Sequence, residues 1–285
     1  MTRRRFPVGK TLLYVFMSLW ALTTIYPFIW VILNYFKPRG LIRSDTFSLP
    51  IGDKFTLENY VTAFKRVDIG TAYVNSIVIS GAVTVVVMVL AGLAAYAMVR
   101  YSFRLRGFLH SMIIASMMFP VFSTIIPVFR MESSWGIVNT GSIWLTRLSV
   151  VLPQIAGNLS FAIIVLMGFI RSLPVDLEEA AYLEGYNVYQ IFFRIIMPLA
   201  KPSFATVGIF TFLWSYNDLF LQMFFLRSKK FFTITRLLNE ISSQAGTNYG
   251  LMVAAVVMVV IPVLVVYIFL QNYIIKGMTA GAVKG

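Results

Sequence analysis

The sequence contains no cysteine and little charge. Its 285 residues include one histidine, and charged side chains make up only 12% of them. Without cysteine the chain has no disulfide framework, thiolate zinc site or thiol nucleophile, and a lone histidine, His110, supplies too few ligands for a metal site. Soluble proteins carry about 25% charged residues, so water is not the only solvent of this chain.

Apolar side chains take the place of the missing charge. Hydrophobic residues make up 59% of the chain, and the mean hydropathy is +0.81. The 25 phenylalanines exclude a disordered chain. We therefore expect an all-α integral membrane protein. The net charge of +13 would suggest nucleic acid in a soluble protein, but here loop lysines and arginines that orient the spans and meet anionic lipid are the better explanation.

Six apolar segments are each long enough to cross a bilayer, for which roughly 20 residues suffice. The first is too long for a signal-peptide core and lacks a small-residue cleavage site, so we expect it to remain as an anchor. The segments are 11–34, 71–98, 108–129, 148–170, 203–226 and 250–275.

An even number of spans places both termini on one side of the membrane. Basic residues are shared equally, twelve on the terminal side and twelve on the other, so the whole count does not orient the chain. Arg3, Arg4 and Arg5 before the first span, and the acid-free loop with Arg100, favour termini inside.

The connection 171–202 lies between the fourth and fifth spans and predicts two short helices. Asp176 is the expected N-cap of the first, with Glu179 at capping-box spacing. Gly185 fits the left-handed position that ends it. Asn187 is then placed to cap a second helix, with Gln190 three residues later.

The two predicted helices differ in character. The second carries an amphipathic stripe, and Pro198 and Pro202 end it before the fifth span. The first exposes acids and two small alanines. A surface helix of this kind either docks on a protein partner or lies on lipid, and the acids, which anionic headgroups repel, favour the protein. The stripe is Val188, Ile191, Phe192, Ile195 and Ile196, and the acids are Asp176, Glu178, Glu179 and Glu184.

Polar and aromatic side chains gather in the fifth apolar segment. One interpretation is a water-filled path in which aromatic faces stack on the apolar faces of a solute and polar groups bond its hydroxyls. The other is interhelical packing, common for Asn and Ser in membranes and favoured for Trp214. The candidate path residues are Trp214, Tyr216, Asn217 and Asp218.

In the loop between the fourth and fifth spans, Glu179, Ala180 and Ala181 are followed by Gly185. This pattern resembles the EAA loop of bacterial ABC importer permeases. The matching positions lie at the family's fixed spacing, although Met197 stands where leucine is usual. The ending, 277–285, and the pair Trp214 and Asn217 are similar to the carbohydrate importers of this family, close to the smaller maltose-type subunit. The matching loop residues are Glu179, Ala180, Ala181, Gly185, Ile195 and Pro198.

The resemblance implies a type I importer permease fold with six transmembrane helices and a cytoplasmic coupling helix. It implies alternating-access import of a carbohydrate, with an oligosaccharide favoured, across the bacterial plasma membrane, with both termini cytoplasmic. The implied partners are a second, homologous permease, two ATPase subunits that bind ATP and magnesium, and an external solute-binding protein. The six loop residues would carry the ATPase docking, and the tail would be a second coupling element.

This resemblance also implies a division of the chain. Residues 1–70 hold the N-terminal segment, an anchor and an external loop, 71–275 form the core transmembrane domain, and 276–285 are a cytoplasmic tail. The candidate contacts of the solute-binding protein lie in 227–249. They are Arg227, Lys229, Lys230, Asn248 and Tyr249.

The chain lacks the chemistry to energise transport by itself. Gly9-Lys10-Thr11 matches only the end of the phosphate-binding P-loop, with no preceding strand, so ATP binding belongs to separate chains. Asp218 is the one clear acid within a predicted span, and a single acid is weak evidence for coupling transport to an ion. No catalytic set or metal site can be assembled within the membrane, so we expect a non-enzymatic subunit that binds no cofactor. The rival interpretations are a permease of the same superfamily for a non-sugar or phosphorylated polyol solute, an ion-coupled transporter, and an intramembrane enzyme or scaffold.

Overall fold

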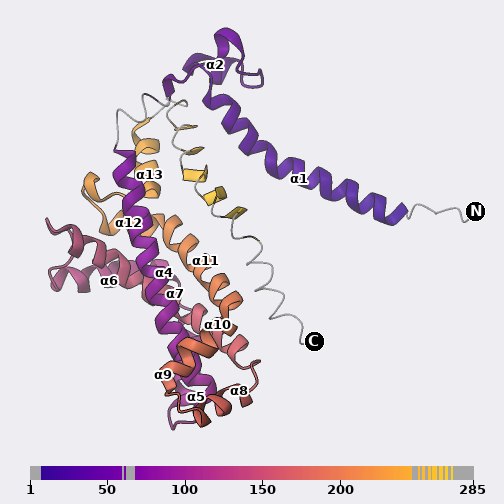
Figure 1. Cartoon of the computed structure of the whole chain (residues 1–285). Helices are drawn as coiled ribbons and strands as arrows, with labels where there is room; N and C mark the ends of the chain where they lie inside the picture. The colour runs from indigo at the N-terminus through magenta and orange to yellow at the C-terminus, as the bar shows by residue number, and fades with distance from the viewer. Residues whose placement is uncertain are drawn as a thin grey trace, which may run out of the picture. The chain divides into compact units, whose positions relative to one another are not determined.

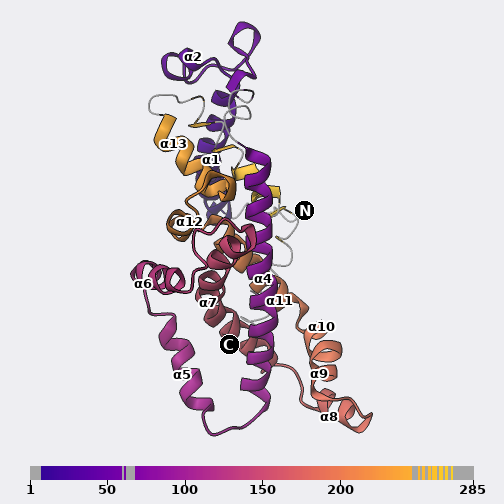
Figure 2. The same ribbon diagram turned by 90° about the vertical axis from the view of Figure 1, so that its left-hand side faces the viewer.

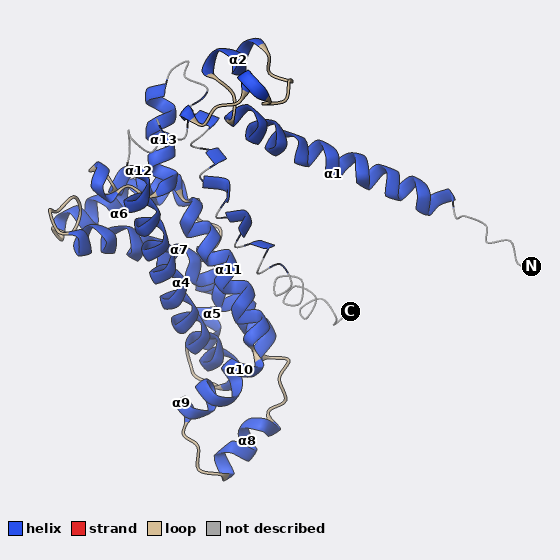
Figure 3. Ribbon diagram, turned by 45° about the horizontal axis from the view of Figure 1, so that its top comes forward, coloured by secondary structure: helices blue, strands red, loops and turns tan. Residues whose placement is uncertain are grey.

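Helices account for every regular element that the computed structural model describes (Figure 3). The prediction of an all-α protein is therefore confirmed over these residues. The sixth apolar segment, 250–275, lies only partly among them, and its described residues are helical. The described residues are 8–59, 61, 68–245, 250, 252, 253, 256, 257, 259–261, 263–265, 267, 268 and 271.

The chain divides into two compact units. The first comprises Met1–Asp68 and Glu240–Ile261, and the second comprises Ile69–Asn239 and Pro262–Gly285. In the first unit, the helix α1 (Val8–Tyr35) covers the expected first span. Its apolar side chains are almost all exposed, an arrangement suited to a helix whose solvent is lipid.

A buried lysine organises the connection after α1. The short helix α2 (Arg39–Ser44) and the 3₁₀ turn η1 (Gly52–Lys54) lie in this connection. Lys37 is fully buried, and its ammonium group donates hydrogen bonds of 2.9 Å to the carbonyl oxygens of Asp45 and Thr46. Burial lowers the pKa of Lys37, and the nearby Asp45 carboxylate opposes that shift. The segment is thus folded on itself rather than simply solvated.

Three long helices form the centre of the second unit. The helix α4 (Ile69–Arg100) packs along α7 (Ile143–Ile170) and α11 (Lys201–Asn217), as Figure 1 shows. Small and β-branched side chains fill the contact, among them Val87 and Ala91, which are fully buried. At Gly92 an added Cβ would lie 2.8 Å from the Phe204 ring, so glycine permits the close approach typical of membrane helices.

The expected third span is broken. Residues 108–129 do not form one helix, because α5 (Arg106–Ser116) and α6 (Val121–Ser134) meet at an angle of 104°. Pro120 lacks an amide hydrogen and disfavours helical geometry at Phe119, and it takes an extended conformation before α6. Figure 2 shows α6 turned away from α5.

The expected fifth span, 203–226, is interrupted as well. The helix α11 ends at Asn217, and α12 (Leu219–Phe225) starts after Asp218. Before α11, the chain bends by 82° between Val188–Leu199 and Lys201–Asn217. By length and composition, three of the described helices can cross a membrane, or five if each bent pair counts as one span.

Candidate functional site

The helix α8 (Asp176–Leu183) lies in the connection that the sequence singled out. The prediction that Asp176 caps it is wrong, because Asp176 is the first helical residue and Val175 holds the N-cap position without a side-chain bond to the described residues. Val175 is itself in helical geometry, and its carbonyl oxygen accepts from the amides of Glu178 and Glu179. The carboxylate of Asp176 still lies in the first turn, where the helix dipole favours negative charge.

Gly185 ends α8 as predicted. Its φ of +85° is in the left-handed region, which costs a residue with a side chain roughly 1–2 kcal/mol. The amides of Gly185 and Tyr186 donate to the carbonyl oxygens of Tyr182 and Ala181, both at 3.0 Å, which is the Schellman arrangement. No described atom lies within 4 Å of an added Cβ at Gly185, so conformation rather than space favours glycine here.

The second helix of the connection starts with the predicted capping box. Asn187 and Gln190 exchange two side-chain-to-backbone hydrogen bonds, of 2.8 and 2.9 Å, at the start of α9 (Val188–Ile191). The π-helical turn η2 (Phe192–Ile196) and α10 (Met197–Leu199) continue it. Pro198 lies within α10 and Pro202 in the first turn of α11, so the break falls between the two prolines.

The amphipathic stripe predicted for this second helix is only partly buried. Ile191, Phe192 and Ile196 are buried, Ile195 is half-buried and Val188 is more exposed. The Phe192 ring lies 5.6 Å from the ring of Tyr96 on α4. The connection is thus packed against the end of α4 rather than lying free.

Four acids of the first helix were expected to be exposed, and one of them is not. Asp176, Glu179 and Glu184 are exposed, but Glu178 is only 4% exposed. Its carboxylate forms an ion pair with Arg100 and accepts a 2.8 Å hydrogen bond from the Tyr96 hydroxyl. No periodicity of 176–183 separates Glu178 from Glu179 in role, so sequence reasoning missed this contact.

The remaining loop residues divide between the surface and the interior. Glu179, Ala180, Gly185 and Pro198 are exposed, whereas Ala181 is buried. Leu183 is 91% exposed, an uncovered apolar side chain beside the acids. The outer face of α8 therefore combines negative charge with small and apolar groups.

The predicted path residues do not line one common surface. Trp214 is half-exposed and meets the Phe161 ring edge-on at 4.8 Å, and Asn217 is exposed. Tyr216 is buried. Asp218 accepts from the Leu221 amide at the start of α12 and from Gln154 on α7, both at 3.1 Å.

Asp218 belongs to a polar network inside the second unit. Ser215 donates to Gln154 at 2.6 Å, and Gln222 donates to the Ser215 carbonyl oxygen at 3.0 Å. Thr233 in turn donates to the Gln222 side chain. The oxygens of Asp218 thus cap a helix and bond a neighbouring span, which matches the packing interpretation for this residue.

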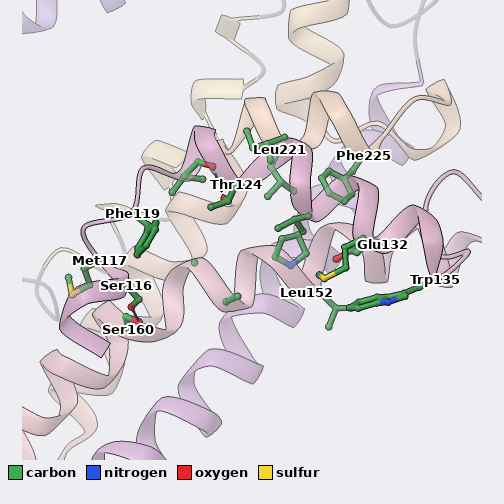
Figure 4. Close-up of a pocket in the computed structure, with 17 residues that line it drawn as sticks. Ser116, Met117, Phe119, Thr124, Glu132, Trp135, Leu152, Ser160, Leu221 and Phe225 are labelled. Atoms are coloured by element: carbon green, nitrogen blue, oxygen red, sulfur yellow. Dashed lines mark hydrogen bonds between the residues drawn. The ribbon is translucent and has the colours of Figure 1, made fainter. Parts of the chain in front are cut away.

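A cavity of about 490 Å³ lies between α6, α7 and α12. Figure 4 shows Glu132, Trp135 and Leu152 at one end and Ser116, Ser160 and Phe119 at the other. Glu132 is 1% exposed, and its Oε2 atom has no hydrogen-bond partner among the described residues. It lies past the end of the predicted third span, so the search for polar groups within spans did not find it.

The basic segment 227–230 is held near the beginning of α4, at the end opposite to Arg100. Arg227, Lys229 and Lys230 are exposed, and the turn η3 (Lys229–Phe231) contains the last two. Asn75 donates to the carbonyl oxygens of Lys230 and Phe232 at 3.2 and 3.1 Å. The other two predicted contacts, Asn248 and Tyr249, lie outside the described residues.

Two further bonds fix this segment. Ser76 accepts a 2.8 Å hydrogen bond from the amide of Ile234, the first residue of α13 (Ile234–Ala245). Arg147 on α7 donates to the Asn75 side chain at 2.8 Å. The backbone of the basic segment is therefore held by α4, and Arg147 of α7 in turn holds the Asn75 side chain.

Residues 88–280 match the family described as the binding-protein-dependent transport system inner membrane component. This range spans more than half of the chain and includes α8 and the cavity. The chain is a member of this family. The resemblance drawn from the EAA loop is thereby confirmed, and the chain is a permease of the ABC type.

Two relatives of the permease match it over nearly their whole lengths. The diacetylchitobiose uptake system permease protein NgcG of Streptomyces coelicolor is 33% identical, covering 95% of this chain and 88% of the relative. The arabinooligosaccharides transport system permease protein AraQ of Halalkalibacterium halodurans is 30% identical and covers all of both chains.

A solved structure shares the fold of the permease. It is a bacterial ABC transporter involved in the import of the acidic polysaccharide alginate. The TM-score is 0.81 at 23% identity, and the alignment covers 96% of this chain and 99% of the other. The architecture around α4, α7 and α11 is thus that of an ABC transporter chain.

Proposed function

We propose that this permease imports an oligosaccharide across the bacterial plasma membrane as one transmembrane subunit of an ATP-driven transporter. The observation that carries the substrate class is the full-length similarity, at 33% and 30% identity, to permeases named for diacetylchitobiose and for arabinooligosaccharides. In this proposal the pair α5 and α6, the pair α11 and α12, and 250–275 complete six spans. Both termini are cytoplasmic, and 71–275 is the core domain between the anchor segment 1–70 and the tail 276–285.

The helix α8 is proposed as the coupling helix that receives force from two separate ATPase subunits. Its outer face presents Glu179, Ala180 and Leu183, and small side chains let a partner surface approach closely. The Schellman end at Gly185 and the capping box at Asn187 fix the angle between α8 and the second helix of the connection, which begins with α9. A docked element of fixed shape suits rigid-body transmission. ATP and magnesium would bind to the ATPase subunits.

The translocation path is proposed to run between this permease and a second, homologous one. Trp214 and Asn217 are exposed on α11 and would face it, whereas Asp218 and Tyr216 would serve packing. Glu132 and Trp135 add a carboxylate and an aromatic face at the cavity, groups that suit the hydroxyls and the apolar face of a sugar ring.

The exposed basic segment is proposed to receive a solute-binding protein. Arg227, Lys229 and Lys230 supply positive charge on a fixed backbone. Charge of one sign on a rigid surface accelerates the encounter with a partner of opposite charge.

Co-purification and uptake test this proposal together. A tagged chain, extracted from its native membrane, is expected to bring along a second permease and an ATPase. The complex is then reconstituted in liposomes with its binding protein. ATP-dependent uptake of labelled chito- or arabino-oligosaccharides would support the proposal. Isolation of the chain alone would contradict the importer assignment, and uptake of a phosphorylated polyol instead would contradict the substrate class.

A further inference from the structure

Two adjacent glutamates of α8 lie on different sides of the helix. Glu178 is 4% exposed and Glu179 is exposed, as expected for neighbours about 100° apart around a helix. The same residue type therefore meets two environments. Glu179 is available to a partner chain, whereas Glu178 is occupied inside this one.

Both oxygens of Glu178 bond the end of α4. Its Oε1 atom lies 2.5 Å from Arg100 Nε, and its Oε2 atom lies 2.8 Å from the Tyr96 hydroxyl. Tyr96 and Arg100 are four residues apart and so share one face of α4. The carboxylate is thus held by two donors from a single helix, which fixes its position more firmly than one bond would.

Further bonds extend this attachment along the connection. Arg100 Nη2 donates to the carbonyl oxygen of Leu173, just before α8, at 2.9 Å. The hydroxyls of Tyr101 and Tyr182 lie 2.9 Å apart. The end of α4 therefore contacts α8 near its beginning and near its end. Figures 1 and 2 both place α8 at this end of α4.

The ring of Tyr96 also joins the second helix of the connection. It lies 5.6 Å from the Phe192 ring, while its hydroxyl bonds Glu178. One α4 residue thus contacts both helices on either side of Gly185. We refer to Tyr96, Arg100 and Glu178 together as the clasp.

We propose that Glu178 is a positioning residue, and that the clasp transmits the displacement of α8 directly into the transmembrane helix α4. This inference rests on the proposed function of α8 as the coupling helix. Because α4 packs along α7 and α11, a displacement that enters α4 reaches the core of the second unit. Glu179 faces the ATPase and Glu178 faces α4, so docking and transmission belong to neighbouring residues.

Glu178→Gln and Glu179→Gln form a matched pair for the test in the complete transporter. In Glu178→Gln the ATPase subunits are expected to co-purify in unchanged amount, while sugar taken up per ATP hydrolysed falls about tenfold. Glu179→Gln is expected to reduce ATPase co-purification. The exchange Glu178→Arg with Arg100→Glu is expected to restore part of the uptake ratio. Lost ATPase co-purification in Glu178→Gln would identify Glu178 as a docking residue and overturn the inference.

A distance measurement tests the clasp independently of transport. The chain has no cysteine, so Val85→Cys on α4 and Leu177→Cys on α8, both exposed and neither assigned to the docking face, introduce two specific positions for spin labels. In the purified complex, Glu178→Gln is expected to broaden the distance distribution between the labels, and Glu179→Gln is expected to leave it unchanged.

The two readouts separate the failure of the clasp from the failure of the proposed function. An unchanged distance distribution, or an unchanged uptake ratio, in Glu178→Gln would overturn the clasp. Absence of the ATPase from the unaltered complex would instead contradict the proposed function, and the label distances would still decide whether Glu178 holds α8 on α4.

Discussion

The two ends of α4 hold two connecting segments by different chemistry. At the end near Ile69, Asn75 and Ser76 bond the backbone of residues 230–234 through neutral groups. At the other end, Arg100 bonds Glu178 of α8 through a buried ion pair. One segment carries exposed basic side chains, and the other carries exposed acidic and apolar ones.

The two attachments differ in whether they depend on the side chains of the attached segment. Bonds to backbone carbonyls fix the path of the chain whatever its side chains are. The ion pair depends on two particular side chains, and loss of either leaves a buried charge without its partner. The segment near Asn75 is therefore expected to tolerate side-chain changes, whereas α8 depends on the identity of Glu178.

Arg100→Met is expected to have the largest effect on stability. It would leave the Glu178 carboxylate buried without its cation, at a cost of about 3–5 kcal/mol. The melting temperature of the purified complex should fall clearly, and the double variant with Glu178→Met should recover much of the loss. If the single and double variants melt alike, the ion pair does not hold this end of α4.

Asn75→Ala tests the neutral end. The loss of the amide leaves two backbone carbonyl oxygens and a nitrogen of Arg147 without their bonds, at a cost of about 1–3 kcal/mol. Hydrogen exchange should accelerate in 226–234 and remain unchanged in 176–186. Accelerated exchange in both segments would show that the two ends are not independent.

Gly185→Val tests the turn next to the ionic end. A β-branched residue at a φ of +85° is expected to cost roughly 1–2 kcal/mol and to lower the uptake achieved per ATP. Gly168→Ala in α7 is the control, because its added Cβ meets nothing among the described residues and its φ is ordinary. Normal coupling in Gly185→Val would contradict the role assigned to this bend.

Asn217→Ala is expected to have the smallest effect on stability, under about 0.5 kcal/mol. The residue is exposed, and its amide donates to the Leu213 carbonyl oxygen within its own helix. Sugar uptake should nevertheless change if Asn217 lines the path. A variant that melts earlier but transports normally would favour packing instead.

Local signals in the sequence predicted much of the connection between α7 and α11. The bend at Gly185 and the capping box at Asn187 depend on neighbouring residues only, and both are confirmed. Asp176 failed as a cap because Val175 already takes helical geometry, so the helix begins one residue earlier than the side-chain pattern indicates. The break at Pro120 had a local signal, the proline itself, but the continuous hydrophobicity of 108–129 concealed it.

The functional residues that sequence reasoning missed are those whose partners lie far away along the chain. Glu178 meets Arg100 across 78 positions, and nothing in its own helix distinguishes it from Glu179. Glu132 joins the cavity because α6 turns back after Pro120 onto α7 and α12. Periodicity identifies the faces of a helix, but it does not identify the residue of another helix that contacts a given face.

In the proposed mechanism, the helix α4 connects the segment that receives the solute-binding protein with the helix α8, which receives force from the ATPase. The most direct test is the ATPase rate of the unaltered, reconstituted transporter when its binding protein is added with and without an oligosaccharide. We predict that the loaded binding protein raises the rate severalfold over the empty one. A rate that does not respond to the loaded binding protein would contradict the claim that this chain joins the two events.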